Sequence, residues 1–343
     1  MKINLIKVAI VTLAAFTVFL AICFFLYGWG DRVVGGRNMN TEYGGAQSTV
    51  AEGNTTFLLL GRDSAAGLCD VIILASLDAT TGNLNVMQIP RDTYFACTDA
   101  DYKKINGAAG ALGSVARFAD ELGRALGVSI DYYLSLDMSA VKQMVDAVGG
   151  IELDVPHDME YRDPAQDLKI SLKAGKQKLD GEAAIGFLRY RAGYVTGDLA
   201  RMDAQKLFLA AFSKKIASQK NPIVYYNLYR ILKKHGETNI TERDVISMTK
   251  DAATGSCTVS YLTAPGEAVQ SKISGAWYYV LSRQSTAEVL ESRFALADGE
   301  KNFDKEHKFV DKTVDRFYDI YKKRCEYKIY SEKDIENNLI NIN

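Results

Sequence analysis

Several charged residues interrupt apolar stretches of the sequence where strands are expected to begin or end. Asp63 follows the run "FLLLG", Asp70 begins "DVIILA", and the pair Arg91 and Asp92 ends "NVMQIP". Two carboxylates at a strand edge suit a hard divalent cation, which leaves its other positions to water and phosphate oxygens. We therefore predict that Asp63 and Asp70 bind Mg²⁺, with Mn²⁺ as the alternative ion. The competing interpretation of each aspartate is an ordinary turn or cap residue.

Further basic and amide residues occur in three later segments. They are Lys104 in "YKKING", Arg189 and Arg191 in "FLRYR", and Arg201 and Gln205 in "LARMDAQ". Arg189 and Arg191 share a face if their segment is extended, whereas residues four apart share a face on a helix. Guanidinium groups match phosphate oxygens with parallel hydrogen bonds. If these residues converge on Arg91 they can bind a pyrophosphate; otherwise each is a solvated surface charge.

Alternating strand and helix patterns place these residues in an α/β domain. Apolar runs predict strands at 56–61, 70–78, 83–90, 131–137 and 151–156, and helical periodicity predicts helices at 108–126, 139–150, 180–190 and 199–217. The continuous run "VIILA" is typical of a strand buried on both faces. We therefore predict a layered α-β-α domain.

Composition excludes two classes of function. The 343 residues include 41 basic and 42 acidic side chains, so the net charge of −1 gives no global field for nucleic-acid binding. Only three histidines are present, His157, His235 and His307, and they are widely separated. A histidine-built metal site or a Ser-His triad is therefore not expected.

A membrane anchor is predicted near the N-terminus. The run 8–27, "VAIVTLAAFTVFLAICFFLY", has 20 residues and no charge, and a helix of that length spans about 30 Å, the thickness of a bilayer core. A cleaved signal peptide is the alternative, but bulky "FFLYGW" stands where a small-residue cleavage site would lie. Basic residues before the run predict a cytoplasmic N-terminus and an extracellular domain on a single-pass cell-membrane protein. We expect a cytoplasmic stub and transmembrane anchor at 1–30 and a Gly/Asn/Ser/Thr-rich linker at 31–54.

Four cysteines follow the predicted anchor: Cys69, Cys97, Cys257 and Cys325. An even number in an oxidising exterior indicates two disulfides, although four cysteines allow three pairings. The expected closeness of the first two in the site favours Cys69 with Cys97 and leaves Cys257 with Cys325. The alternative is four reduced core residues.

Six blocks of the sequence together resemble the LytR-CpsA-Psr family. In the family's order and with similar spacing, they are "LLLGRD", "CDVIILASLDATTGNLNVMQIPRDTYF", "KING", "IDYYLSLDMSAVKQMVDAVGGIELDVP", "LKAGKQKLDGEAAIGFLRYR" and "GDLARMDAQ". The resemblance covers residues 55–295, the expected catalytic domain, and leaves 296–343 as a C-terminal helical extension. It implies an α/β core with a mixed central sheet and a long apolar pocket for a lipid. It also implies a membrane-anchored extracellular enzyme that transfers a glycopolymer, such as teichoic acid or capsule, from a polyprenyl-pyrophosphate carrier to peptidoglycan.

The resemblance also assigns roles to residues. Asp63 and Asp70 match the metal-associated aspartates of the family. The matched pyrophosphate-binding residues are Arg91, Lys104, Arg189, Arg191, Arg201 and Gln205. The implied reaction is a Mg²⁺-assisted phosphoryl transfer, in which a sugar hydroxyl attacks the polymer-bearing phosphorus and polyprenyl phosphate leaves. The expected catalytic residues are Arg91, Asp92, Arg189 and Arg191, with Asp92 as the candidate acceptor of the hydroxyl proton.

The chain departs from the family pattern at several positions. The family usually has Arg-Ser-Asp-Thr where this chain has Leu68, Cys69, Asp70 and Val71, and it often has an arginine at the position of Ala204. A less charged site would alter polymer specificity or weaken catalysis. A Cys69–Cys97 bridge would instead stabilise the short loop after Asp63.

Two alternative functions remain at this stage. A pyrophosphatase would use the same charges with water in place of a sugar acceptor. A membrane-tethered binding or regulatory protein would hold polyprenyl-linked substrates without turning them over, and the missing arginines are compatible with that role.

Overall fold

The protein is seen here as a computed structural model, which describes residues 54–63, 67–78, 81, 83–97, 103–164, 168–191, 198–219, 221–241, 244, 258–296 and 299–336. Within these ranges, no helix combines the length and the apolar character needed to cross a bilayer. The anchor and linker predicted at 1–30 and 31–54 fall in the part of the chain outside these ranges.

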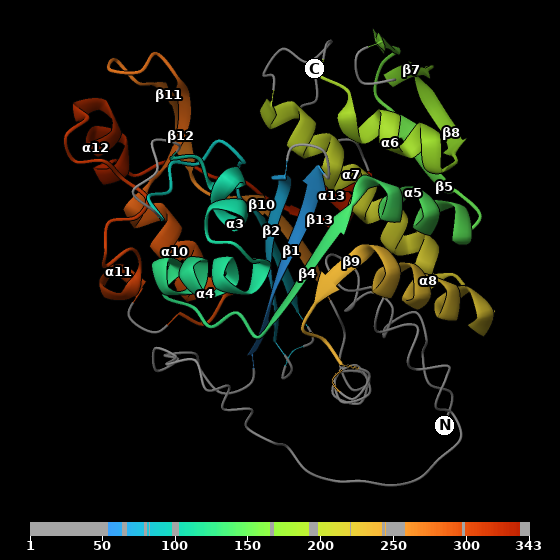
Figure 1. Ribbon diagram of the computed structural model, residues 1–343, viewed down its shortest axis with the longest axis horizontal. Coiled ribbons are helices and arrows are strands. Elements are labelled where there is room, and N and C mark those ends of the chain that lie inside the picture. The colour runs from blue at the N-terminus through green and yellow to red at the C-terminus, as the bar shows by residue number, and fades with distance from the viewer. Residues whose placement is uncertain are drawn as a thin grey trace, which may run out of the picture.

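A seven-stranded sheet forms the centre of the described structure, in the order β13-β10-β3-β2-β1-β4-β9 (Figure 1). Its strands are β1 (Asn54–Asp63), β2 (Leu68–Asp78), β3 (Leu84–Gln88), β4 (Tyr132–Asp137), β9 (Gly236–Thr238), β10 (Val259–Thr263) and β13 (Ile329–Ser331). β1 pairs with β4, and β3 with β10, in parallel, while β2, β9 and β13 pair antiparallel with their neighbours. The prediction of an α/β fold with a mixed sheet is confirmed. The carboxyl ends of β1, β3, β4 and β10 therefore lie at one edge of the sheet, called the carboxyl edge below.

Helices cover both faces of this sheet, because successive strand residues point to opposite sides. Phe57 and Ile73 belong to one apolar cluster, whereas their neighbours Leu58 and Ile72 belong to the other. The first cluster is covered by α5 (Met138–Ala147), α6 (Gly181–Arg189), α7 (Asp198–Ala217), α8 (Pro222–His235) and α13 (Glu332–Glu336). The second is covered by η1 (Ile105–Gly107), α3 (Ala108–Ala111), α4 (Val115–Leu126), α10 (Arg283–Arg293), α11 (Gly299–Asn302) and α12 (Asp315–Lys322).

The helix predicted at 108–126 is two helices. Gly113 has a φ of +78°, which interrupts the helical backbone. The side chain of Ser114 then accepts a hydrogen bond from the backbone N–H of Arg117 and begins α4 as its N-cap. α4 ends at Gly127, which is in the left-handed conformation.

Within the described residues, three two-stranded antiparallel sheets lie outside the central sheet. They pair β5 (Ile151–Val155) with β8 (Gly175–Leu179), β6 (Met159–Asp163) with β7 (Leu168–Leu172), and β11 (Gly266–Gln270) with β12 (Trp277–Leu281). The β11–β12 hairpin and α12 project together from the α4–α10 side of the molecule (Figure 1).

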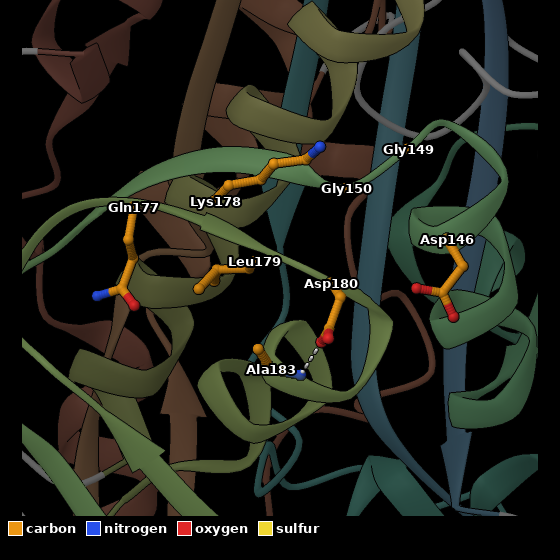
Figure 2. A pocket seen from close by; sticks show the side chains of 8 residues that line it. All are labelled: Asp146, Gly149, Gly150, Gln177, Lys178, Leu179, Asp180 and Ala183. Carbon is orange, nitrogen blue, oxygen red and sulfur yellow. Dashed lines mark hydrogen bonds between the residues drawn. The ribbon is translucent and has the colours of Figure 1, made fainter.

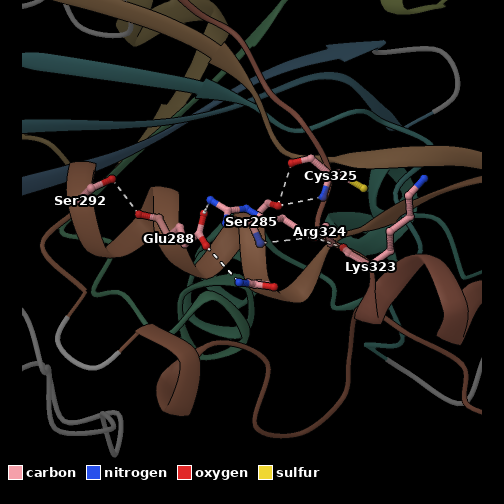
Figure 3. A network of polar contacts seen from close by, with 8 residues as sticks. Ser285, Glu288, Ser292, Lys323, Arg324 and Cys325 are labelled. Atoms are coloured by element: carbon pink, nitrogen blue, oxygen red, sulfur yellow. Dashed lines mark hydrogen bonds and ion pairs between the residues drawn. The ribbon is translucent and has the colours of Figure 1, made fainter.

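The C-terminal segment is packed into the second cluster. Phe303, Phe309 and Phe317 are buried there. Ser285 on α10 binds the backbone of Cys325 twice: its hydroxyl donates to the Cys325 carbonyl at 2.8 Å and accepts from the Cys325 N–H at 3.0 Å (Figure 3). The chain then forms β13 at the end of the central sheet.

Candidate functional site

Arg91 and Asp92 lie in a turn at the carboxyl edge, directly after β3. Thr93 closes this turn, since its hydroxyl and its backbone N–H both donate to the Pro90 carbonyl, at 2.6 and 2.9 Å. The β12 strand braces the other side, because the N–H of Tyr279 donates to the Asp92 carbonyl at 2.9 Å. The Arg91 carbonyl accepts from the N–H of Asn106 in η1 at 3.2 Å. The turn is therefore held by its own hydrogen bonds and by two other elements, β12 and η1.

Asp70 is turned toward Arg91 by a β-bulge. The pairing of β1 with β2 runs from Gly61 opposite Val71 to Arg62 opposite Cys69, so Asp70 is the extra residue in the ladder. Bulges of this kind redirect a side chain. The Asp70 carboxylate lies 2.6 Å from Nη1 of Arg91, and both side chains remain partly exposed, at 22% and 19%. The contact joins the start of β2 to the end of β3.

A second ion pair lies beside the first. Nζ of Lys104 donates to the Asp92 carboxylate at 2.8 Å, and it lies 5.7 Å from the ring centre of Tyr278 on β12. Lys104 is fixed by a bridge of its backbone to Tyr94. Two cations and two carboxylates are thus gathered at the end of β3, all of them accessible to a ligand.

α7 approaches the same edge with a buried polar face. Gln205 accepts a hydrogen bond at 2.5 Å from Nε2 of Gln88, the last residue of β3. Arg201, one turn earlier on α7, is 3% exposed. Lys206 is also buried, with Nζ at 2.6 Å from Asp203 and 2.8 Å from the Thr263 hydroxyl at the end of β10. Burial lowers the pKa of Lys206, while the Asp203 carboxylate opposes that shift.

Arg189 and Arg191 stand at the end of α6. Arg189 is the last helical residue and is half-buried, Tyr190 is extended, and Arg191 is exposed. The pair therefore does not lie on one extended strand. α6 packs on α7, whereas the ion pairs of Arg91 and Lys104 described above are formed with Asp70 and Asp92.

The predicted metal ligands belong to neighbouring strands. Asp63 ends β1 opposite Leu68, and Asp70 lies two residues further along β2. Nowhere in the described ranges do three or more His, Cys, Asp or Glu side chains form a group that could hold a metal ion. Two carboxylates nevertheless suit Mg²⁺ where substrate phosphate oxygens and water supply the remaining ligands.

Comparison with known proteins identifies the family. A profile described as "LytR_cpsA_psr family" matches residues 35–294. The chain belongs to the LytR-CpsA-Psr family. This membership confirms the resemblance that the sequence blocks indicated.

Curated relatives within the family carry a transferase name. The polyisoprenyl-teichoic acid–peptidoglycan teichoic acid transferase TagU of Bacillus cereus (strain ATCC 14579) is 31% identical over 228 residues, which cover 65% of this chain and 72% of TagU. The protein of the same name from Bacillus cereus (strain AH820) is 30% identical over 247 residues, covering 71% and 78%.

Solved structures of the family share the fold. The crystal structure of B. subtilis TagV is 24% identical and superposes with a TM-score of 0.60, covering 72% of this chain and 98% of TagV. A structure of TagT bound to LIIa-WTA is 21% identical with a TM-score of 0.56, covering 74% and 91%.

The disulfides predicted for this family member are absent from the described structure. Cys69, Cys97 and Cys325 are thiols, so the Cys69–Cys97 prediction is wrong. β-Sheet pairing opposite Arg62 fixes Cys69 in the apolar core, whereas Cys97 lies in a tight turn whose N–H donates to the Phe95 carbonyl. A bond would need the two β-carbons to face each other at close range. Burial raises the pKa of Cys69 to about 11, as expected of an inert core thiol.

The Cys257–Cys325 pairing is likewise not formed, since Cys325 is a thiol. Cys257 itself lies outside the described residues.

A hollow of about 280 Å³ lies near the start of α6, and two carboxylates that line it hold this helix in position (Figure 2). Asp180 caps α6 by accepting from the N–H of Ala183 at 2.9 Å. Asp146 on α5 accepts from the N–H of Gly181 at 2.7 Å. These carboxylates stabilise the helix that ends at Arg189. The Asp180–Gly181 capping pattern is visible in the sequence, but the contribution of Asp146 depends on tertiary packing.

Proposed function

We propose that this protein transfers a glycopolymer, of the teichoic acid, capsule or other wall-polysaccharide type, from a polyprenyl-pyrophosphate carrier to peptidoglycan. The observation that carries the proposal is the gathering of Arg91, Lys104, Asp70 and Asp92 at the carboxyl edge of a LytR-CpsA-Psr domain. Crevices at the carboxyl ends of parallel strands are where α/β proteins commonly bind ligands. The curated relatives are named as transferases of the same class.

Arg91 and Lys104 would bind the diphosphate. The forked guanidinium of Arg91 can donate two parallel hydrogen bonds to phosphate oxygens, while Lys104 adds a compact charge. Asp70 and Asp92 hold both cations in place at 2.6 and 2.8 Å, so little reorganisation is needed when the substrate arrives. Arg189, Arg191, Arg201 and Gln205 are proposed to complete the binding set, and Gln205 is joined to the end of β3 through Gln88.

The chemistry would be an in-line displacement. The oxygen of an acceptor sugar hydroxyl forms a bond to the phosphorus that bears the polymer, and the bond from that phosphorus to the bridging oxygen breaks. Polyprenyl phosphate leaves with the bridging oxygen, and Asp92 accepts the hydroxyl proton. Arg91 and Lys104 stabilise the negative charge that grows on the transferring and leaving oxygens.

We further propose that Asp63 and Asp70 hold Mg²⁺, or Mn²⁺, together with the diphosphate. When bound, the ion supplies positive charge that neutralises the phosphate oxygens. Asp70 accepts a hydrogen bond from Arg91 at 2.6 Å, so one carboxylate would contact both the guanidinium and the ion.

The proposal extends to location and domain organisation. A single-pass anchor at 1–30 and a linker at 31–54 would tether an extracellular catalytic domain at 55–295, and the extension at 296–343 would complete the core of that domain. The family profile begins before the predicted domain and ends with it, at residues 35–294.

Transfer of labelled, lipid-linked glycopolymer to peptidoglycan fragments tests the proposal. The full chain is assayed in proteoliposomes with Mg²⁺, alongside Arg91→Ala and a control, Arg117→Ala, which removes an exposed arginine on α4. We expect transfer by the wild type and the control, and a loss of about 10²–10³-fold in Arg91→Ala.

Two outcomes would contradict the transferase assignment. Release of free polymer phosphate, with no labelled peptidoglycan, would identify a pyrophosphatase. Retention of the lipid-linked polymer without turnover under all conditions would identify a binding protein.

A further inference from the structure

The tip of the β11–β12 hairpin exposes two large apolar side chains. Ile273 is 78% exposed and Trp277 is 57% exposed, and the neighbouring Lys272 is exposed as well. The tip itself is an ordered turn, because Ser271 receives backbone hydrogen bonds at its carbonyl and at its hydroxyl. Gly275 completes the turn with a φ of +71°. The apolar surface is therefore held outward by the fold.

This hairpin is attached to the candidate site. Backbone hydrogen bonds of 2.9 Å link Tyr279 on β12 to Asp92 and to Tyr94. Lys104, which binds Asp92, lies over the ring of Tyr278. Whatever surface binds the tip of the hairpin will consequently lie beside the Arg91 turn.

α12 adds cationic side chains to the same projection. Phe317 packs on Tyr278, with ring centres 5.4 Å apart, and this contact places the first turn of α12 beside the hairpin. The flanking residues Lys312 and Arg316 are exposed. Among the acids of these elements, Asp319 is exposed, Asp311 is hydrogen-bonded to Tyr94, and Glu267 on β11 is paired with Lys323 at 2.6 Å.

Tryptophan, an aliphatic side chain and exposed cations together have the chemistry of a bilayer interface. Trp places its ring at headgroup level, an aliphatic side chain enters the acyl boundary, and Lys or Arg binds anionic headgroups. We propose that the β11–β12 hairpin, assisted by α12, contacts the phospholipid bilayer and turns the carboxyl edge toward the membrane. The proposal rests on the proposed function in one respect, namely that a polyprenyl carrier must reach the site from that bilayer.

The predicted tether does not itself impose this orientation. β1 begins at the edge opposite to the site, and its 10 residues span about 33 Å. The 26 residues at 28–53, between the apolar run at 8–27 and β1, could reach at most about 90 Å when extended. Either edge could thus face the membrane, so a second contact is needed to set the orientation.

Trp277 can report on this contact directly, since Trp29 is the only other tryptophan. The full chain carrying Trp29→Phe is placed in vesicles of phosphatidylglycerol and phosphatidylcholine, with and without brominated acyl chains. We expect Trp277 in the vesicle-bound protein to emit at a shorter wavelength than in protein unfolded by denaturant without detergent. We also expect its fluorescence intensity to fall when the lipid is brominated. Adding Ile273→Asp should shift the Trp277 emission back to the longer wavelength of a solvent-exposed indole. The substitution should not unfold the protein, because the Ile273 side chain is already largely exposed.

The control probe lies far from the hairpin. Glu291→Trp, combined with Trp29→Phe and Trp277→Phe, places the indole at an exposed position of α10. This position is close to Arg293, whose carbonyl accepts a hydrogen bond from Asn85 in the first half of β3. This probe should not be quenched by brominated lipid.

Three results would overturn the proposal. The first is equal quenching of the two probes, and the second is no quenching of Trp277. The third is a shift of Trp277 emission that does not need lipid but needs soluble peptidoglycan fragments or a higher protein concentration. The last result would identify a glycan or a second copy as the occupant. Since the readout needs no turnover, quenching in a protein that transfers nothing would leave the membrane contact standing while the transferase proposal failed.

Discussion

At the scale of residues, we propose that the two ion pairs beside β3 serve ligand binding more than stability. The Arg91–Asp70 and Lys104–Asp92 pairs are partly exposed, and pairs of that kind stabilise a fold by about 0–1 kcal/mol. Their geometry instead presents two ordered cations, with a carboxylate beside each, to an incoming diphosphate. The roles of the four groups can be separated kinetically.

Asp92→Asn separates the proposed proton acceptor from the binding cations. We expect kcat for transfer to fall by about 10²-fold or more, while KM for the lipid-linked substrate stays constant or falls, because a negative charge near the diphosphate has been removed. Steady-state kinetics over a range of substrate concentrations measures both constants. Asp120→Asn, an exposed aspartate on α4, is the control; an Asp92 variant with unchanged kcat would remove Asp92 from the mechanism.

Asp304 gives a prediction for stability against pH. Burial raises its pKa from 3.8 to about 6, despite hydrogen bonds from Tyr321 and from the N–H groups of Phe309 and Lys308. Because the pKa of Asp304 in the folded protein lies above its unfolded value, the group contributes most to the free energy of unfolding below about pH 4. This contribution is lost as the pH rises to about 6. The shift corresponds to about 3 kcal/mol.

Urea unfolding at several pH values tests this prediction with Asp304→Asn as the comparison. The free energy of unfolding of the wild type, taken relative to the variant, should decrease between pH of about 4 and about 6. A relative value that is flat or increases across this interval would show that Asp304 is not the buried titrating group.

At the scale of elements, the bulge in β2 is the feature that brings Asp70 to Arg91. Gly61 faces it on β1, and a β-carbon added there would lie 3.0 Å from Cβ of Val71. Since Cβ of Val71 is fixed to the backbone, the strand would have to move. The absence of a side chain at residue 61 therefore permits the close strand pairing next to the bulge.

Gly61→Ala tests this dependence. We expect a loss of about 1–3 kcal/mol in the free energy of unfolding from overpacking, measured by urea denaturation, and lower transfer because Asp70 and Arg91 move. Gly110→Ala is the control, since the nearest atom to its added β-carbon is 3.8 Å away. Equal stability of the two variants would show that β1 and β2 accommodate the methyl group without strain.

Much of this architecture could be predicted from local patterns. The apolar runs at 70–78 and 131–137 form β2 and β4, and the charged residues Asp63, Asp70 and Arg91 indicated where strands begin or end. The bulge at Asp70 could not be predicted, because it depends on the register between two strands. The short edge strands β9 and β13 have three residues each, too few for a period-two pattern to emerge.

Only part of the candidate site could be predicted from the sequence. The types and positions of Asp70, Arg91, Asp92 and Lys104 indicated phosphate chemistry, but their pairing depends on the turn closed by Thr93 and β12. The Arg189-x-Arg191 spacing favoured one extended face, whereas α6 continues to Arg189. The even cysteine count favoured disulfides, and only the packing of Cys69 in the core shows why that inference fails.

At the scale of the whole molecule, the C-terminal segment completes the core that supports the site. Phe303, Phe309, Phe317 and Tyr321 are each no more than 2% exposed. Phe317 also contacts Tyr94 and Tyr278, next to the Asp92 turn. The segment thus connects the stability of the core with the position of the Asp92 turn.

A chain ending at residue 296 should not fold cooperatively. Loss of one buried Phe side chain costs about 3–5 kcal/mol, and removal of several exceeds the total stability of a typical domain, about 5–15 kcal/mol. Near-UV circular dichroism and urea unfolding of the truncated chain measure this. A chain ending at residue 336, which keeps every described element, is the control; a cooperative transition in the shorter chain would show that the segment is dispensable.

We propose that the cations at the carboxyl edge hold the diphosphate of a polyprenyl carrier. Native mass spectrometry of the full chain, released gently from bacterial membranes, tests it most directly. The account predicts a bound polyprenyl phosphate or pyrophosphate on the wild type and on Arg117→Ala, and its loss from Arg91→Ala. A wild-type protein without lipid, or an Arg91→Ala protein that retains as much lipid as the wild type, would contradict it.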